Sequence, residues 1–312
     1  MRNGFLLGLL LILAVTPACS VNMVNHGTGG NGSGGSADLG GGGGGGGFGG
    51  GGGGGGGTWT GNDGGTASSY IVYAHSNTML YTIDVMTKML VTVGPFNAPT
   101  VGTGPDVMQD LAVAPDNTIY VISKATLYTA DPKDGHVTVV GSVTACGTDN
   151  VALTNTKDGK LYVADYKGAF CQIDLSTKPP TVKTIGTIGG NMAIAGDIVG
   201  IGDGSLYGTA YNLADKANMG TQANNVLIKI DPATGAMQTM LGATGYPKLF
   251  GIAYANGLVF GFTHDGSGNV VTIDPKTGAG TPFNTFNDPA TGKGISFGGA
   301  GVNSMVPPTP IG

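Results

Sequence analysis

A motif that recurs five times along the chain constrains its fold more than any other feature. Each copy is a short apolar run that ends in Asp, and two of the five copies continue with Pro-x-Thr-Gly. The terminal Asp residues are separated by 47, 43, 57 and 43 positions, a spacing typical of the four-stranded sheets of a β-propeller. One such sheet cannot bury both of its faces, so the copies must stack around a common axis. These residues are Asp84, Asp131, Asp174, Asp231 and Asp274.

The residues that follow each Asp predict a tight hairpin turn. In Asp231-Pro232-Ala233-Thr234-Gly235, the Asp side chain can bond the backbone of the turn, Pro presets φ, and Gly takes the left-handed position. The same chemistry is present from Asp274 to Gly278, and the copy at Asp84 lacks both Pro and Gly. We therefore expect the repeated Asp residues to be structural and not catalytic.

The ends of the repeat region indicate a closed ring. The first copy begins with strand 70–74, without an inner strand before it, and residues 295–302 have the small, apolar character of that missing strand. The sequence predicts an all-β fold, a propeller of five four-stranded blades closed by this C-terminal strand. Six blades are the alternative, because the 57-residue spacing could contain a degraded copy. The domain is expected to span residues 70–306, with a tail at 307–312.

The N-terminus predicts export. Arg2 is followed by an apolar run, residues 5–15, that is too short to span a bilayer, as in a signal peptide covering residues 1–18. Residues 19–69 are rich in Gly and cannot pack a core, so we expect a flexible linker.

Thr16-Pro17-Ala18-Cys19-Ser20 resembles the lipobox of bacterial lipoproteins, although Thr16 replaces the usual Leu and Pro is rare at position 17. The resemblance implies a lipid on Cys19 and an anchor in the outer membrane or at the cell surface. The same residues also fit ordinary signal cleavage, which would give a periplasmic or secreted chain.

The amino-acid composition argues against one class of ligand for this protein. Only 11% of residues are charged, the net charge is −5, every acidic residue is Asp, and Arg2 is the single Arg. This surface is too dilute in positive charge to neutralise phosphates, so nucleic acid is not an expected partner. We expect a monomer.

Two cysteines remain after Cys19. Cys146 and Cys171 are an even pair in a compartment that permits disulfides. The alternative is that Cys171 is a small buried apolar residue and that Cys146 lies in a loop beyond its reach.

The repeat is similar to those of bacterial extracytoplasmic propellers of the YVTN, NHL and quinoprotein-like kind. The resemblance covers nearly the whole of residues 70–302 and implies the architecture, which hosts binding proteins and unrelated enzymes alike. Pyrroloquinoline-quinone dehydrogenases share the Asp-x-x-Thr-Gly element, but no Trp closes any copy here.

Propeller lactonases bind a divalent metal with Glu, Asn and Asp in their channel, and the lack of Glu departs from that pattern. Asp110, Asn150 and Asp197 stand where inner strands are expected to begin. They could offer oxygen ligands to calcium or magnesium at the channel mouth. Their other role would be to cap strand ends beside trapped water, and this is the role we favour.

Two further features are candidates for ligand binding. His75 and His264 occupy matching places at the ends of second strands and could act together across neighbouring blades, although surface loops are their more ordinary setting. The connection at about residues 211–225 is longer than its counterparts and contains Asn212, Asp215 and Lys216. Long connections are often functional, and a tolerated insertion is the alternative.

No motif reaches a specific chemistry. The leading hypothesis is a non-enzymatic binding scaffold of the cell envelope, with no cofactor and with an unknown protein or glycan ligand. The alternative is a metal-dependent hydrolase or lyase, similar to the lactonases, with Asp and Asn at the channel mouth.

Overall fold

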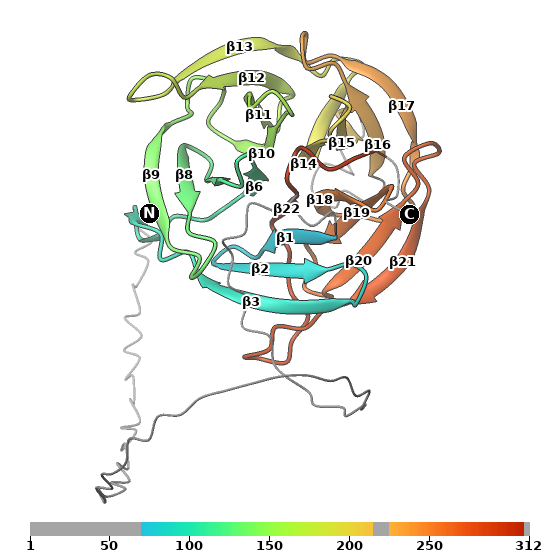
Figure 1. The fold of residues 1–312 in the computed structure, drawn as a ribbon. Helices are drawn as coiled ribbons and strands as arrows, with labels where there is room; N and C mark the ends of the chain where they lie inside the picture. The colour runs from blue at the N-terminus through green and yellow to red at the C-terminus, as the bar shows by residue number, and fades with distance from the viewer. Residues whose placement is uncertain (1–69, 215–224, 309–312) are drawn as a thin grey trace, which may run out of the picture. The chain divides into compact units, whose positions relative to one another are not determined.

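The computed structural model describes residues 70–214 and 225–308, and these residues form a five-bladed β-propeller. Five four-stranded antiparallel sheets surround one axis, with their first strands at the centre and their fourth strands at the rim (Figure 1). No helix in the described part of the chain is long and apolar enough to cross a membrane.

The sheets are numbered as blades 1 to 5 in chain order. Blade 1 contains β22 (Gly299–Gly301), β1 (Ile71–His75), β2 (Met79–Asp84) and β3 (Met89–Pro95). Blade 2 contains β6 (Asp110–Val113), β7 (Ile119–Ile122), β8 (Thr126–Ala130) and β9 (Val137–Ser142). Blade 3 contains β10 (Asn150–Asn155), β11 (Leu161–Asp165), β12 (Ala169–Asp174) and β13 (Thr181–Thr187).

Blade 4 contains β14 (Met192–Gly200), β15 (Leu206–Asn212), β16 (Val226–Ile230) and β17 (Met237–Ala243). Blade 5 contains β18 (Leu249–Ala255), β19 (Leu258–Thr263), β20 (Asn269–Ile273) and β21 (Gly280–Thr285). A small hairpin of β4 (Thr100–Val101) and β5 (Gly104–Pro105) lies between blades 1 and 2 in the chain.

The C-terminal strand closes the ring, as the sequence predicts. β22 is antiparallel to β1, with Tyr73 opposite Gly301 and His75 opposite Gly299. The 57-residue spacing does not contain a sixth blade. β14 is longer than any other first strand, with nine residues, and the connection after β15 accounts for the rest of the extra length.

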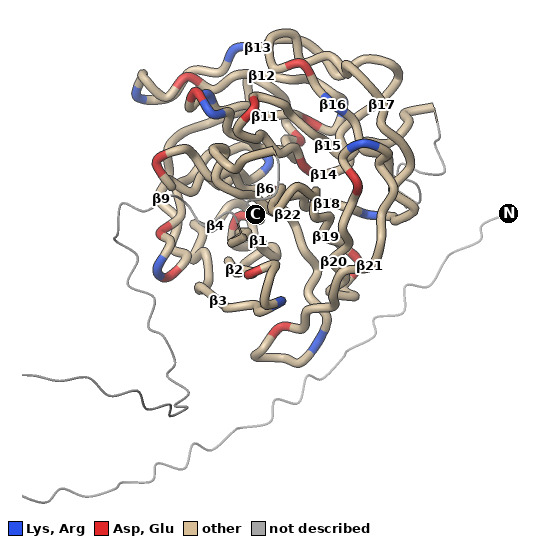
Figure 2. The backbone as a smooth tube through the Cα atoms, turned by 45° about the vertical axis from the view of Figure 1, so that its right-hand side comes forward, with Lys and Arg blue, Asp and Glu red and all other residues tan. Residues whose placement is uncertain are grey.

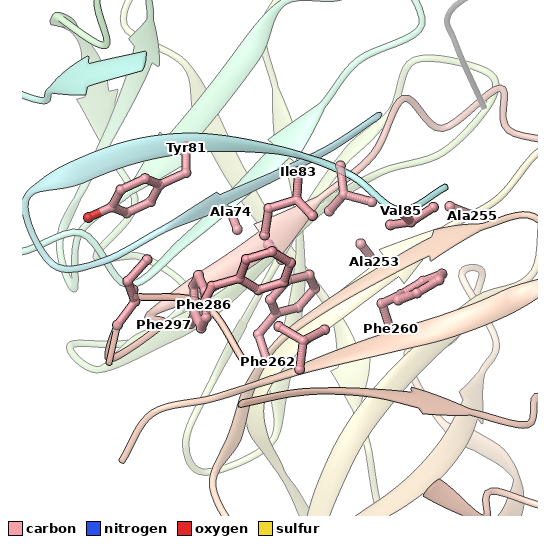
Figure 3. Packing of buried hydrophobic residues seen from close by; sticks show 14 residues of the cluster. Ala74, Tyr81, Ile83, Val85, Ala253, Ala255, Phe260, Phe262, Phe286 and Phe297 are labelled. Atoms are coloured by element: carbon pink, nitrogen blue, oxygen red, sulfur yellow. The ribbon is translucent and has the colours of Figure 1, made fainter. Parts of the chain in front are cut away.

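The core lies between adjacent blades. The first strands are almost wholly buried, whereas the outermost strands are half exposed and alternate in burial. The cluster between blades 1 and 5 is the largest, and Figure 3 shows Ala74 and Ile83 of blade 1 packed with Phe260 and Phe262 of blade 5. Because each sheet buries its faces against its neighbours, the blades cannot fold independently.

The repeated motif forms the predicted turn between the third and fourth strands. The Asp231 side chain accepts a hydrogen bond from the N–H of Ala233 at 2.9 Å, and the Asp231 carbonyl accepts one from Gly235 at 2.7 Å. Gly235 has φ of 71°. In the first copy, Lys88 takes this left-handed position with φ of 57°.

These turns also fit against the outer strand of the preceding blade. A Cβ on Gly186 would lie 2.0 Å from the Thr234 carbonyl oxygen, and one on Gly242 would lie 2.2 Å from that of Thr277. Only glycine leaves room for the approaching turn. Sequence reasoning did not find this contact, although the signal, an apolar residue followed by Gly in the fourth strand, is present in several copies.

The segment after β22 crosses one end of the central channel. Ser304 Oγ donates to the Thr156 carbonyl at 3.2 Å, the Gly202 N–H donates to the Val306 carbonyl at 2.8 Å, and Tyr254 Oη donates to that of Pro308 at 2.6 Å. Thr156, Gly202 and Tyr254 belong to three different blades. This segment therefore covers the face that carries the turns between first and second strands.

Candidate functional site

Asp110 and Asp197 meet at the axis of the ring. Asp110 is the first residue of β6, whereas Asp197 lies within β14, at a shift of register between Ile194 and Ile198, and not at a strand start. Both side chains are fully buried. The structure thus brings together two of the residues that the sequence singled out.

Asp110 connects blades 2 and 3. Its Oδ1 accepts a hydrogen bond from the N–H of Leu111 at 2.7 Å, and its Oδ2 accepts one from the N–H of Leu153 in β10 at 2.6 Å. Hydrogen bonds from backbone donors satisfy an acceptor that burial removes from water.

Asp197 connects blade 4 with blades 5 and 1. Its Oδ2 accepts hydrogen bonds from the N–H of Ile252 in β18 and, at 3.2 Å, from the N–H of Ala300 in β22. Gly299 lies against Asp110 and the next residue, Ala300, donates to Asp197, so the two carboxyl groups are neighbours and one polar cluster joins the innermost strands of all five blades.

Burial raises the pKa of both carboxyl groups well above the ordinary value for Asp. The neighbouring carboxyl group of Asp197 raises the pKa of Asp110 further, and the backbone N–H groups oppose these effects in part. Two neighbouring buried carboxyl groups cannot both be ionised without a large electrostatic cost.

His75 borders this cluster. Its Nδ1 lies 2.8 Å from the Ser76 carbonyl oxygen, and its ring is fully buried with an edge contact to Phe96. Burial lowers the pKa of His75 to about 4. A Cβ on Gly299 would lie 2.5 Å from His75 Nε2 and 2.4 Å from Asp110 Oδ1, so this position requires glycine.

His264 lies on the other side of the segment that leads into β22. Its Nδ1 is 2.7 Å from the Phe297 carbonyl oxygen, and its ring stacks on Phe250 with centroids 4.7 Å apart. Phe297 and Gly298 are consecutive residues that contact His264 and His75 respectively, so the two histidines are neighbours across blades 1 and 5. The N–H of Gly298 donates to the His75 carbonyl at 2.7 Å, which fixes the segment between them.

Asn150 holds a loop. Its Nδ2 donates to the carbonyl oxygens of Lys124 at 2.7 Å and Gly147 at 2.9 Å, while its Oδ1 has no partner among the described residues. Asn212 is exposed at the end of β15, where its Oδ1 accepts the N–H of Ala214 at 2.8 Å.

Asp215 and Lys216 lie outside the described residues. Within residues 70–214 and 225–308, no group of three His, Cys or Asp side chains is arranged to hold a metal ion.

A disulfide joins Cys146 to Cys171, with their Cα atoms 5.8 Å apart. Cys171 belongs to β12, and Cys146 lies in the loop that leads into β10. The bond therefore fixes the loop that Asn150 also holds.

A pocket of about 320 Å³ opens on the face that carries the connections between second and third strands. One wall is the connection from β1 to β2, and the other is the connection from β21 to β22. The lining residues are Ser76, Asn77, Thr78, Tyr81, Asp288, Thr291, Lys293, Gly294, Ile295 and Ser296.

The second wall contains a sixth copy of the turn element. Asp288-Pro289-Ala290-Thr291-Gly292 repeats the letters of residues 231–235, yet no blade accompanies it. The N–H of Asp288 donates to the Lys293 carbonyl at 2.8 Å, and Gly292 has φ of 69°. Sequence reasoning missed this copy because no apolar strand precedes it.

A pocket of similar size, about 330 Å³, lies on the opposite face between blades 2 and 3. Lys157, Asp158 and Tyr120 are among its lining residues. Figure 2 shows Lys and Asp positions of both signs distributed over the described chain, without a large region of one sign.

No protein-family model matches this chain, and no curated protein matches it. Among solved structures, it is similar to a chain of a nidogen/laminin complex, with 12% identity and a TM-score of 0.47 over 76% of this chain and 98% of that one.

It is also similar to a PQQ-bound aldose sugar dehydrogenase from Streptomyces coelicolor, with 16% identity and a TM-score of 0.38 over 58% of this chain and 63% of that one. A third likeness is to a symmetrical protein of de novo evolutionary origin, with 15% identity and a TM-score of 0.44 over 75% and 98% of the two chains. These likenesses concern the propeller fold alone.

Proposed function

We propose that this protein is a non-enzymatic binding scaffold, and that its ligand is a neutral glycan held in the pocket between the β1–β2 connection and residues 288–296. The observation that carries the proposal is the set of polar groups in that pocket. Side chains of Asn77, Thr78, Lys293 and Ser296 line it, and none of these four has a hydrogen-bond partner among the described residues.

The charges in the pocket favour a neutral ligand. Asp288 and Lys293 are its only charged lining residues, and their charges are opposite. The remaining polar groups are hydroxyls and one amide, which can both donate and accept hydrogen bonds. A polyhydroxylated ligand matches such a mixture better than an anion or a cation does.

Apolar groups complete the pocket. Tyr81 and Ile295 are buried residues of the lining. A mostly apolar base with a few placed polar groups is the usual composition of a small-molecule site, and the volume lies at the lower end of the range for such sites.

The axial carboxyl groups support a role without catalysis. A general acid or base must come within hydrogen-bond reach of its substrate. Asp110 and Asp197 are fully buried and bond to backbone N–H groups of other blades. They hold the ring together and offer no oxygen to a bound molecule.

We place this scaffold at the cell envelope, held by a lipid on Cys19, which lies outside the described residues. Growth with an alkyne-labelled palmitate should label the chain, and Cys19→Ala should abolish the label. An equally labelled Cys19→Ala chain would contradict the anchor and leave the binding proposal untouched.

A glycan array tests the binding proposal. The full chain should bind one group of neutral oligosaccharides, and Asn77→Ala and Lys293→Ala should each weaken that binding at least tenfold. Lys157→Ala is the matched control, because it removes a Lys from the pocket on the opposite face. Absence of binding to any neutral glycan, or equal loss with Lys157→Ala, would refute the proposal, and a protein ligand would then replace it.

A further inference from the structure

The cluster at the axis has a property that neither the fold nor the proposed binding pocket requires. Among the described residues, Asp110 and Asp197 are the two acidic residues with no exposed surface, and adjacent residues of β22, Gly299 and Ala300, contact them, so their carboxyl groups are neighbours. An ionised carboxylate can only accept hydrogen bonds. A hydrogen bond between two carboxyl groups therefore needs a proton on one of them.

We propose that the axis of this propeller is a proton-binding site, in which one proton shared by Asp110 and Asp197 locks the five blades together. Without that proton, two negative charges would face each other in a place that water does not reach. The cost of such a pair grows steeply as the effective dielectric constant falls.

The hydrogen bonds assign the proton to Asp197. Both oxygens of Asp110 already accept a backbone N–H, from Leu111 and Leu153. Asp197 uses Oδ2 for both of its partners in other blades, and its Oδ1 accepts no bond from a described residue. The Asp197 Oδ1–H group is thus the donor, and the Asp110 carboxylate is the acceptor.

Among the described residues, no Lys is one of the groups that shift the pKa of either carboxyl group. From β22, only Gly299 and Ala300 face the pair, and β18 contributes Ile252. From β1, His75 borders the pair, and burial keeps its ring neutral above about pH 4. His264 lies beyond His75 and is partly exposed. From β10, the neighbour is the backbone of Leu153.

The sign of the pH dependence follows from the direction of the pKa shift. The folded pair keeps a proton that an unfolded Asp, with its ordinary pKa of 3.8, releases. The contribution to stability is therefore complete below pH 3.8 and is lost as the pH rises toward the pKa of the folded pair. Across that window the unfolding equilibrium constant increases by up to tenfold per pH unit.

Asp197→Asn imitates the protonated state. The amide oxygen can accept the N–H groups of Ile252 and Ala300, and the amide nitrogen can donate to Asp110 in place of the Oδ1–H group. Asp110→Asn is the matched control, because its amide nitrogen must face the N–H of either Leu111 or Leu153. We expect Asp110→Asn to lower stability at every pH.

Urea unfolding of the full chain between pH 5 and 9 gives the first test. The midpoint for the original chain should fall relative to Asp197→Asn as the pH rises, and Asp197→Asn should be the more stable form at the alkaline end. Comparing the two chains cancels the titration of every other group, including His75. Parallel pH profiles would overturn the proposal.

Infrared spectroscopy gives a second test that does not depend on the variant folding. At pH 5.5, ordinary Asp side chains are ionised, so a protonated-carboxyl stretching band in the folded chain reports this pair. We expect one such band, lost in Asp197→Asn and on unfolding. A folded original chain without that band would overturn the proposal. Neither test involves a glycan, so either result leaves the binding proposal to be judged separately.

Discussion

Gly186 in the outer strand of blade 3 supports the Thr234 carbonyl in the turn of blade 4 so closely that a Cβ on Gly186 would lie 2.0 Å from that oxygen. The motif that repeats along the chain is therefore more than a turn. In blades 2, 4 and 5 it also packs against the outer strand of the preceding blade.

Substituting Gly186 tests this contact. We expect Gly186→Ala to lower the free energy of unfolding by about 3 kcal/mol, because the strand or the turn must move to admit a methyl group. Gly104→Ala is the control, since nothing lies within 4 Å of a Cβ there and its backbone is not left-handed. Urea unfolding of both variants measures the difference, and equal stabilities would argue against the contact.

The degraded turn of blade 1 offers a stabilising change. Lys88 has φ of 57° at the position where three other copies have glycine. Lys88→Gly should raise the free energy of unfolding by about 1 kcal/mol, because the left-handed conformation costs a residue with a Cβ about that much. Lys88→Ala removes the contact of Lys88 with Phe283 without relieving φ. It should not stabilise the chain, and a gain equal to that of Lys88→Gly would contradict this explanation.

The disulfide should contribute strongly to stability. It closes a loop with a sequence separation of 25, for which the loss of unfolded-chain entropy corresponds to about 3.5 kcal/mol. Thermal or urea unfolding with and without dithiothreitol measures this contribution. Cys146→Ala should be destabilised to a similar degree and should no longer respond to the reductant. An original chain that is indifferent to the reductant would show that the bond contributes little.

His75 should make the fold sensitive to acid. Burial lowers its pKa from 6.5 to about 4, so the unfolded chain binds a proton in this range that the folded chain does not. Its contribution is complete above pH 6.5, and about 3 kcal/mol is lost as the pH falls through 4.

The measurement is the stability of the original chain minus that of His75→Gln between pH 4 and 7. The difference should shrink as the pH falls. His136→Gln, which removes an exposed imidazole, is the control. A difference that is constant with pH would show that His75 is not buried in neutral form.

The sequence predicted the blades well because turn chemistry is local. Asp231 and Gly235 define their hairpin within five residues, and the same letters recur at residues 274–278. The closing strand could be inferred because the first copy lacked an inner strand. The sixth turn, at residues 288–292, could not be predicted in this way. It has the amino acids of the turn but lacks the apolar strand that precedes the other copies.

Only part of the axial cluster could be predicted from the sequence. The sequence suggested Asp110 and Asp197, but their contact depends on where two strands from different blades meet. Asp197 reaches the axis because the register of β14 shifts between Ile194 and Ile198. No residue type near Asp197 in the sequence indicates that shift. The burial of His75 likewise depends on Gly299, which is more than two hundred residues away in the chain.

The pairing of β1 with β22 sets the order in which the fold can be completed during synthesis. Tyr73 and Gly301 are partners at opposite ends of the propeller, so the ribosome makes the last strand of blade 1 after every other strand. Until then, β1 is an open sheet edge, and Asp197 lacks its bond to Ala300. The nascent chain therefore cannot close its ring until residues 299–301 have emerged from the ribosome. The other strands of the propeller are synthesised before that point and must wait with the ring open.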